Sequence, residues 1–119
     1  VVIMGTPSNL NQIILDFTNR LKLDERYQRF LKDFLIQTYG SNYNDYSPSE
    51  RVKSLGNLPG LIIHDTNDLD VDIAQAHLNH ENWPNSKLHI TKGLGHRRIL
   101  SDPEIFEVIR AFVLQDHNL

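Results

Sequence analysis

Residues 58–68 of this chain read LPGLIIHDTND, and this stretch decides the fold. A Pro-Gly pair interrupts the preceding segment, and the apolar run 61–63 follows it, with His64 at its end. A run with almost no polar face is typical of a central strand that is covered on both sides. We therefore expect a buried strand that delivers Asp68 to the loop at its carboxyl end.

The segments around this strand predict helices that alternate with two more strands. The further strands are expected in the apolar run 1–4, which turn residues close, and in the partly alternating run 87–91. Helices are expected at about 9–22, 25–39, 48–55 and 73–80, and from 103 onward. Strands separated by helical segments are typical of parallel βαβ units, so we predict an α/β fold with about three parallel strands.

The long strand-free stretch divides the chain into three parts. Residues 1–8 are expected to form one strand of the core, residues 9–56 a helical cap or lid insertion, and residues 57–119 the rest of the core. Within the insertion, Ser47-Pro48-Ser49-Glu50 has the pattern of a capping box with proline at the first helical position.

The second helix of the insertion has the clearest periodicity in the chain. Asp24 is a suitable N-cap, and Gly40 stands where the helix is expected to end. Its apolar stripe recurs at helical spacing and consists of Tyr27, Phe30, Leu31, Phe34 and Leu35. The aromatic members of this stripe can line a substrate pocket beneath a cap or pack as ordinary core.

The composition bounds the class of protein. The chain has 119 residues, 39% of them hydrophobic and 23% charged, which fits one soluble globular domain. The net charge is −3 and no basic stripe is present, so we expect no nucleic-acid partner. No run of about 18 apolar residues occurs, so we expect no membrane span. The absence of cysteine excludes disulfides, thiolate catalysis and cysteine-ligated zinc.

Two side chains that follow neighbouring strands form the main candidate site. Asp68 follows the buried strand, and His96 follows the next strand in the turn Gly93-Leu94-Gly95-His96. Because the carboxyl ends of parallel strands meet at one edge of the sheet, we expect these side chains to lie close together. An aspartate that accepts the ring N–H of a histidine fixes its tautomer, as a general base requires.

With these motifs the chain resembles the C-terminal part of the α/β-hydrolase family. The acid of that family follows a strand in a pattern like His-Gly-x-x-Asp, which stands here at residues 64–68 with Asp65 in place of the glycine. Its histidine follows the last strand in a Gly-x-Gly-His turn, here residues 93–96, and a helix near Asp-Pro closes the fold, here from residue 102.

The resemblance implies that Asp68 is the triad acid and His96 the triad base of a serine hydrolase. The implied substrate is a small-molecule ester, amide or related acyl compound, and neither a cofactor nor a metal is implied. Asp70 and Asp72 are rivals for the acid that lie further past the strand. The helical stretch before residue 58 is similar to the cap or lid of such enzymes.

The nucleophile motif of the family, Gly-x-Ser-x-Gly, does not occur in the chain. The resemblance therefore implies that nucleophile and oxyanion hole precede Val1, and that the chain is inactive alone. The run 1–4 would then be a bare sheet edge, so we expect self-association through it. No signal peptide is visible, and a cytoplasmic location is expected on that ground.

Two other classes of function stay open. A non-enzymatic α/β binding or interaction module would explain why no nucleophile motif occurs. A helical interaction domain built on residues 9–56 would use the strands only as a scaffold. A Gly-x-Ser-x-Gly motif upstream of Val1 would favour the hydrolase over both.

Several other polar residues have competing interpretations. His77 and His80 have a metal-compatible spacing on a helix, but a solvated face is the favoured interpretation. His64 is expected to be a buried, packed or hydrogen-bonded structural residue. Arg97 and Arg98 follow His96 directly, and they can bind an acidic substrate group or form surface salt bridges.

Overall fold

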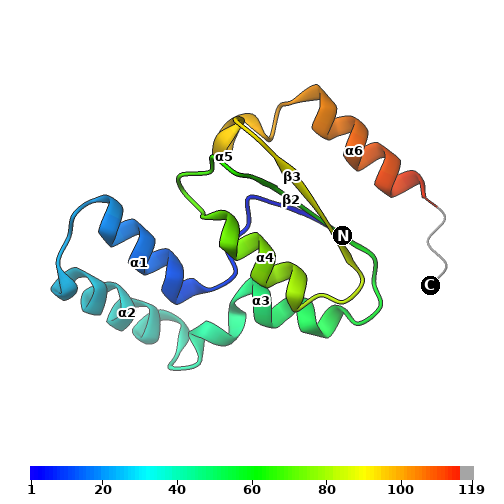
Figure 1. Cartoon of the computed structure of the whole chain (residues 1–119). Helices are drawn as coiled ribbons and strands as arrows, with labels where there is room; N and C mark the ends of the chain where they lie inside the picture. Colours follow the sequence, from blue (N-terminus) through cyan, green and yellow to red (C-terminus); the bar gives the residue numbers. More distant parts are fainter. Residues whose placement is uncertain (116–119) are drawn as a thin grey trace.

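The computed structural model describes residues 1–115 and has an α/β fold, with helices around one parallel sheet (Figure 1). Its strands are β1 (Val2–Met4), β2 (Gly60–Asp65) and β3 (Ser86–Thr91), in the order β1-β2-β3. Ile62 of β2 pairs with Ile3 on one side and with Leu88 on the other. The prediction of three parallel strands with a central strand at 61–64 is confirmed.

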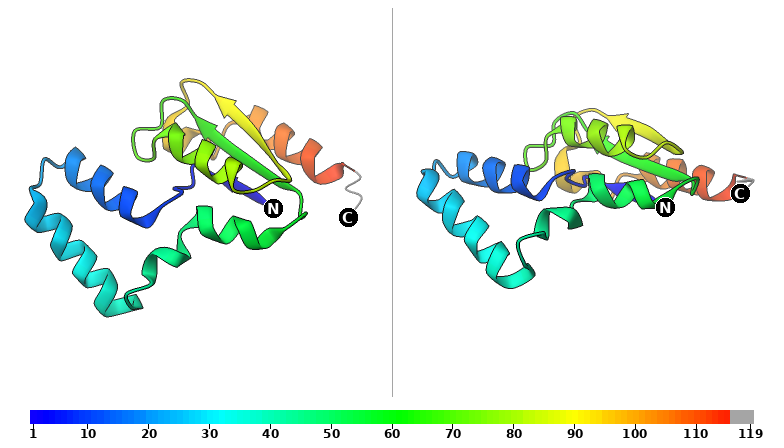
Figure 2. Two further views of the ribbon diagram at one scale, coloured as in Figure 1. Left: turned by 60° about the horizontal axis from the view of Figure 1, so that its bottom comes forward. Right: turned by 90° about the horizontal axis from the view of Figure 1, so that it is seen from below.

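Every residue of β2 is buried, because helices cover both faces of the sheet. Successive side chains of a strand point to opposite faces, and two separate apolar clusters result. Leu61 and Ile63 pack with residues of α6 (Pro103–Leu114), whereas Ile62 packs with residues of α4 (Ile73–Glu81) and its surroundings. The two helices lie on opposite sides of the sheet (Figure 2).

Gly60 is needed at the start of β2 because the indole of Trp83 lies against it. A Cβ atom at Gly60 would be 2.2 Å from Cζ2 of Trp83. Trp83 is fully buried, and its Nε1 donates a hydrogen bond to the carbonyl oxygen of Leu58 at 3.0 Å. The Pro-Gly pair therefore does more than break the preceding helix, since the glycine makes room for the largest buried side chain.

The stretch between β1 and β2 consists of helices and the loops that join them, with no strand. Asp24 caps its second helix, as predicted, by accepting the N–H of Arg26 at 2.9 Å. The first two helices form a hairpin that projects from the sheet (Figure 2). The elements of the stretch are α1 (Leu10–Arg20), α2 (Glu25–Tyr39), η1 (Tyr43–Tyr46), α3 (Pro48–Arg51) and η2 (Val52–Leu55).

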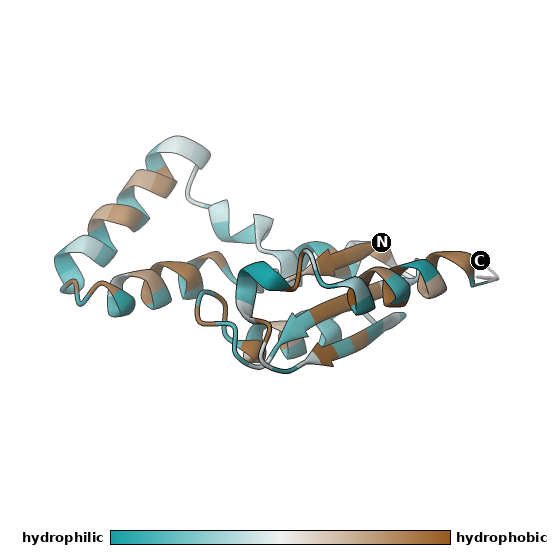
Figure 3. Ribbon diagram, turned by 90° about the horizontal axis from the view of Figure 1, so that it is seen from above, coloured by the Kyte–Doolittle hydropathy of each residue, from teal (hydrophilic) through white to brown (hydrophobic). Residues whose placement is uncertain are grey.

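The aromatic residues of the α2 stripe are exposed, so core packing was the wrong interpretation for them, whereas Leu31 and Leu35 are half-buried. No residue of α2 is buried, and the exposed fraction is 67% for Phe30 and 54% for Phe34. The reason is that the hairpin projects away from the sheet, and Figure 3 shows hydrophobic bands along it. Tyr27 and Phe30 line a surface cavity of about 370 Å³ together with Arg26. Neither Asp68 nor His96 lines this cavity.

The capping box predicted at residues 47–50 does not form. Ser47 caps no N–H of α3; its Oγ instead accepts the N–H of Leu10 at 3.1 Å and contacts Oδ1 of Asn44 at 3.0 Å. The hydroxyl is thus used to join the start of α3 to the start of α1. The helix is accordingly a single α-turn that continues as η2.

Within residues 1–115, no helix has the length and apolar character needed to cross a membrane.

Candidate active site

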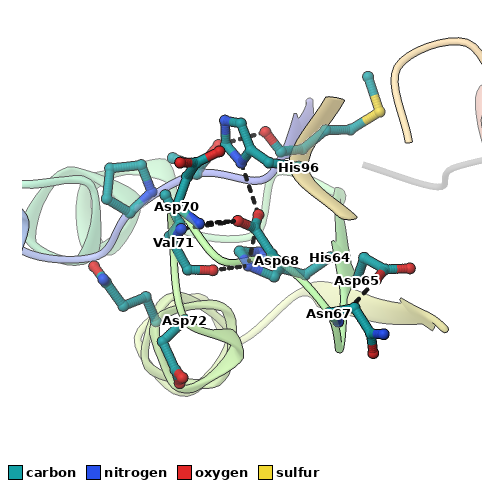
Figure 4. Close-up of polar contacts among 12 residues, drawn as sticks. His64, Asp65, Asn67, Asp68, Asp70, Val71, Asp72 and His96 are labelled. Atoms are coloured by element: carbon teal, nitrogen blue, oxygen red, sulfur yellow. Dashed lines mark hydrogen bonds and ion pairs between the residues drawn. The ribbon is translucent and has the colours of Figure 1, made fainter. Parts of the chain in front are cut away.

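Asp68 and His96 meet at the carboxyl edge of the sheet (Figure 4). Nδ1 of His96 lies 2.7 Å from Oδ2 of Asp68. Asp68 stands in the loop after β2, and His96 stands in α5 (Gly95–Arg98), a short helix after β3. The side chain of Asp68 is 1% exposed and that of His96 is 34% exposed. The result is a buried carboxylate that holds one nitrogen of a solvent-facing imidazole.

The carboxylate of Asp68 stabilises the loop in which Asp68 stands. Oδ1 accepts the N–H of Asp70 at 2.9 Å and that of Val71 at 2.8 Å. Aspartate favours this kind of local turn, because its short side chain reaches backbone N–H groups two and three residues ahead. With Oδ1 engaged in this way, Oδ2 is the oxygen that faces His96.

His64 lies directly behind Asp68 and is fully buried at the end of β2. Its Nε2 is 2.8 Å from the carbonyl oxygen of Val71 and 3.4 Å from Oδ2 of Asp68. Since both neighbours are acceptors, Nε2 carries the hydrogen. Nδ1 of His64 has no hydrogen-bond partner among residues 1–115. The structural interpretation of His64 is confirmed, and its N–H also faces the carboxylate that holds His96.

Asp65 joins the two loops of the site, a role that the sequence did not indicate. Its Oδ2 accepts hydrogen bonds from Oγ1 of Thr91 at 2.5 Å and from the N–H of Leu94 at 2.9 Å. Its Oδ1 accepts the N–H of Asn67 at 2.8 Å. Desolvation raises the pKa of Asp65, but hydrogen bonds from Thr91, Gly95, Leu94 and Asn67 outweigh it and lower the pKa to about 2.

The rivals for the acid have other partners. Asp70 forms an ion pair with Arg20 of α1. Asp72 caps α4 by accepting the N–H of Ala74 at 2.8 Å. Asp68 is therefore the carboxylate that hydrogen-bonds His96.

Asp68, Asp70 and His96 also form a group that could hold a metal ion, since their ligand atoms lie within 4.8 Å of one another. The donor set does not favour this use. Oδ2 of Asp68 already contacts His96, and the carboxylate of Asp70 is paired with Arg20. A cation would compete with both contacts. The two histidines of α4 differ in their surroundings. His77 is exposed, so the solvated-face interpretation fits it. It does not fit His80, because Nδ1 of His80 contacts Ser86 Oγ at 2.6 Å.

The two arginines after His96 differ in their surroundings. The guanidinium of Arg98 donates to the carbonyl oxygens of Gly93 at 2.6 Å and Leu94 at 3.0 Å, so it holds the turn before His96. Arg97 is exposed and lines a surface cavity of about 240 Å³ together with His96. Surface salt bridging was thus the wrong interpretation of Arg98, because backbone carbonyls take its donors.

No protein-family model and no curated protein matches this chain.

Proposed function

We propose that this chain supplies the acid and the base of a serine-type acyl hydrolase, with Asp68 as the acid and His96 as the base. The observation that carries the proposal is the 2.7 Å contact between Nδ1 of His96 and Oδ2 of a buried Asp68. A histidine held this way has its other nitrogen, Nε2, available to exchange protons at the solvent-facing edge.

In the proposed reaction, Nε2 of His96 takes the proton of a serine hydroxyl as its oxygen attacks the acyl carbon of an ester or amide. Asp68 keeps the hydrogen of the neutral ring on Nδ1 and stabilises the imidazolium that forms. His96 then gives the proton to the leaving oxygen or nitrogen, and water repeats the sequence to release the acid. No step requires a cofactor.

The nucleophile is proposed to come from a segment outside residues 1–119, because none of the serines stands in a Gly-x-Ser-x-Gly motif. Two features support a place for it beside β1. Within residues 1–115, β1 pairs with β2 alone, so its other edge can accept a strand. The end of β1 is also next to His96, since a Cβ at Gly5 would lie 3.0 Å from Cε1 of that ring.

The test is hydrolysis of an activated ester by the protein expressed with the reading frame upstream of Val1. His96→Ala is expected to abolish turnover and labelling by a fluorophosphonate. His77→Ala is the matched control, because His77 is an exposed histidine of α4 and has no hydrogen bond to Asp68 or His96. Undiminished hydrolysis by His96→Ala, or loss of hydrolysis on chelation, would rule the proposal out. Absence of both turnover and labelling in the unmodified protein would favour a binding module.

A further inference from the structure

We propose that Asp65 is the positioning residue that holds His96 against Asp68. Its effect on catalysis rests on the function proposed above, but its effect on the His96–Asp68 hydrogen bond does not. The carboxylate of Asp65 hydrogen-bonds neither of these side chains, and it acts through the backbone that carries them.

Three parts of the site donate to the one carboxylate. Asn67 belongs to the loop that carries Asp68, Thr91 is the last residue of β3, and Leu94 stands two residues before His96. Asp65 is itself the last residue of β2 and is fully buried. The carboxylate therefore joins the loops that follow two adjacent strands at the edge where Asp68 and His96 meet.

The turn that carries His96 needs such a restraint. Gly93 and Gly95 have positive φ angles of +81° and +72°, and glycine has more accessible backbone conformations than any other residue. The peptide groups of Leu94 are held from two sides, because its N–H donates to Asp65 and its carbonyl oxygen accepts from Arg98. Loss of either contact would let the turn, and with it the imidazole, move relative to Asp68.

An amide cannot replace the carboxylate. Both oxygens of Asp65 accept backbone N–H groups, one from Asn67 and the other from Leu94. Asparagine has a single acceptor oxygen and two N–H donors, so in either orientation its NH₂ group faces a backbone N–H. One partly buried backbone donor is then left without its partner, which favours displacement of its loop.

The test uses Asp65→Asn and Thr91→Val, with NMR of the His96 ring nitrogens as the first readout. In the unmodified protein the ring hydrogen is expected on Nδ1, in a strong hydrogen bond to Asp68. Both variants are expected to weaken the signal of this hydrogen bond and to change the tautomer balance. Asp102→Ala is the control, because it removes a carboxylate that caps α6 and has no hydrogen bond to residues 93–96.

The second readout is steady-state kinetics of the protein expressed with its upstream frame. Asp65→Asn is expected to lower kcat by about 10²-fold with KM within about twofold, since a misplacement of about 1 Å costs that much. Thr91→Val removes one of the donors to Asp65 and leaves the backbone donors in place, so an intermediate loss of kcat is expected. It also keeps the test decisive if Asp65→Asn does not fold.

The two proposals fail in different ways. If the unmodified protein hydrolyses no ester, the proposed function fails, while the NMR comparison still decides the role of Asp65. If both variants fold and keep the His96 ring signals of the unmodified protein, the positioning role is overturned whatever the activity.

Discussion

The backbone of Gly5 lies against the imidazole of His96. A Cβ atom at Gly5 would be 3.0 Å from Cε1 and 3.1 Å from Nδ1 of that ring. Gly5 follows β1, whereas His96 follows β3, so residues that follow the two outer strands of the sheet meet at the site. β2 contributes Asp68 between them. The site is therefore assembled from all three strands.

This contact predicts that Gly5→Ala displaces the ring of His96. The added methyl group would be tighter against the imidazole than ordinary van der Waals contact, so the hydrogen bond to Asp68 is expected to lengthen. In the protein expressed with its upstream frame, a decrease in kcat of about 10- to 100-fold is expected, with weakening of the His96 Nδ1–H signal in NMR.

A matched control separates the ring contact from backbone strain. Gly56 has φ +56°, nearly the same as the +57° of Gly5, but a Cβ there would meet no atom within 4 Å. Both alanine variants are expected to lose about 1 kcal/mol or more of stability, because alanine is strained at such angles. Only Gly5→Ala is expected to change the His96 signals, and an equal change in Gly56→Ala would contradict the contact.

In the full-length parent protein, Asp68→Asn is expected to lower ester hydrolysis by up to about 10⁴-fold. The amide can donate to Nδ1 of His96, which favours the tautomer with the hydrogen on Nε2 and removes the base that the serine requires. Asp72→Asn is the control, since asparagine is also a good N-cap and Asp72 has no hydrogen bond to His96. Similar losses in the two variants would argue against Asp68 as the acid.

Much of the fold and the juxtaposition of Asp68 and His96 could be predicted from the sequence. The reason is that parallel topology brings the ends of successive strands to one edge, whatever the details of the loops. The hydrogen bond between them then requires only local turns after each strand. Asp68 stabilises the turn after β2 by accepting the N–H of Val71.

The role of Asp65 and the exposure of α2 could not be predicted, for different reasons. Asp65 accepts hydrogen bonds from backbone N–H groups, among them those of Asn67 and Leu94, and the residue types at these positions do not reveal such contacts. The periodicity of α2 reports an apolar face but not what covers it, and the hairpin geometry leaves Phe30 exposed. Ser47 shows the same limit, because a tertiary contact with Leu10 replaced the local cap.

Gly60→Ala is expected to destabilise the protein by about 1–3 kcal/mol, because the methyl group overlaps the indole of Trp83. Urea unfolding measures the change in free energy. A double-mutant cycle with Trp83→Leu tests the cause, since the smaller side chain gives the methyl group space. The double variant is expected to lose less stability than the sum of the single losses, and strict additivity would contradict the overlap.

The lowered pKa of Asp65 predicts that the protein loses stability in acid. Its native pKa is lowered to about 2 from an ordinary value of 3.8, so the folded state favours the ionised form. The stabilisation is fully present above pH 3.8 and is lost as the pH falls through about 2, because the unfolded chain binds the proton first. Urea unfolding between pH 5 and about 2 is expected to show this loss, and Asp65→Asn is expected to reduce the slope. Equal slopes for both proteins would contradict the shift.

The outer edge of β1 predicts self-association of the 119-residue chain. Val1 accepts from the N–H of Leu61, and Gly5 donates to the carbonyl of Ile63, so odd-numbered residues of this segment face β2. The N–H groups of Val2 and Met4 therefore point away from β2, where no strand among residues 1–115 pairs with them. An apolar strand with such an edge is a template for pairing with another copy.

Proline substitutions at two neighbouring positions of β1 test whether its outer edge pairs with another copy. Proline removes one backbone N–H and fixes φ, so its effect depends on which edge the lost N–H faced. Val2→Pro removes a donor on the outer side and is expected to abolish concentration-dependent association in sedimentation equilibrium while the fold is kept. Ile3→Pro removes a donor on the inner side, so it is expected to destabilise the sheet instead. A monodisperse monomer of the unmodified chain at high concentration would show that β1 tolerates its open edge and would remove the case for association.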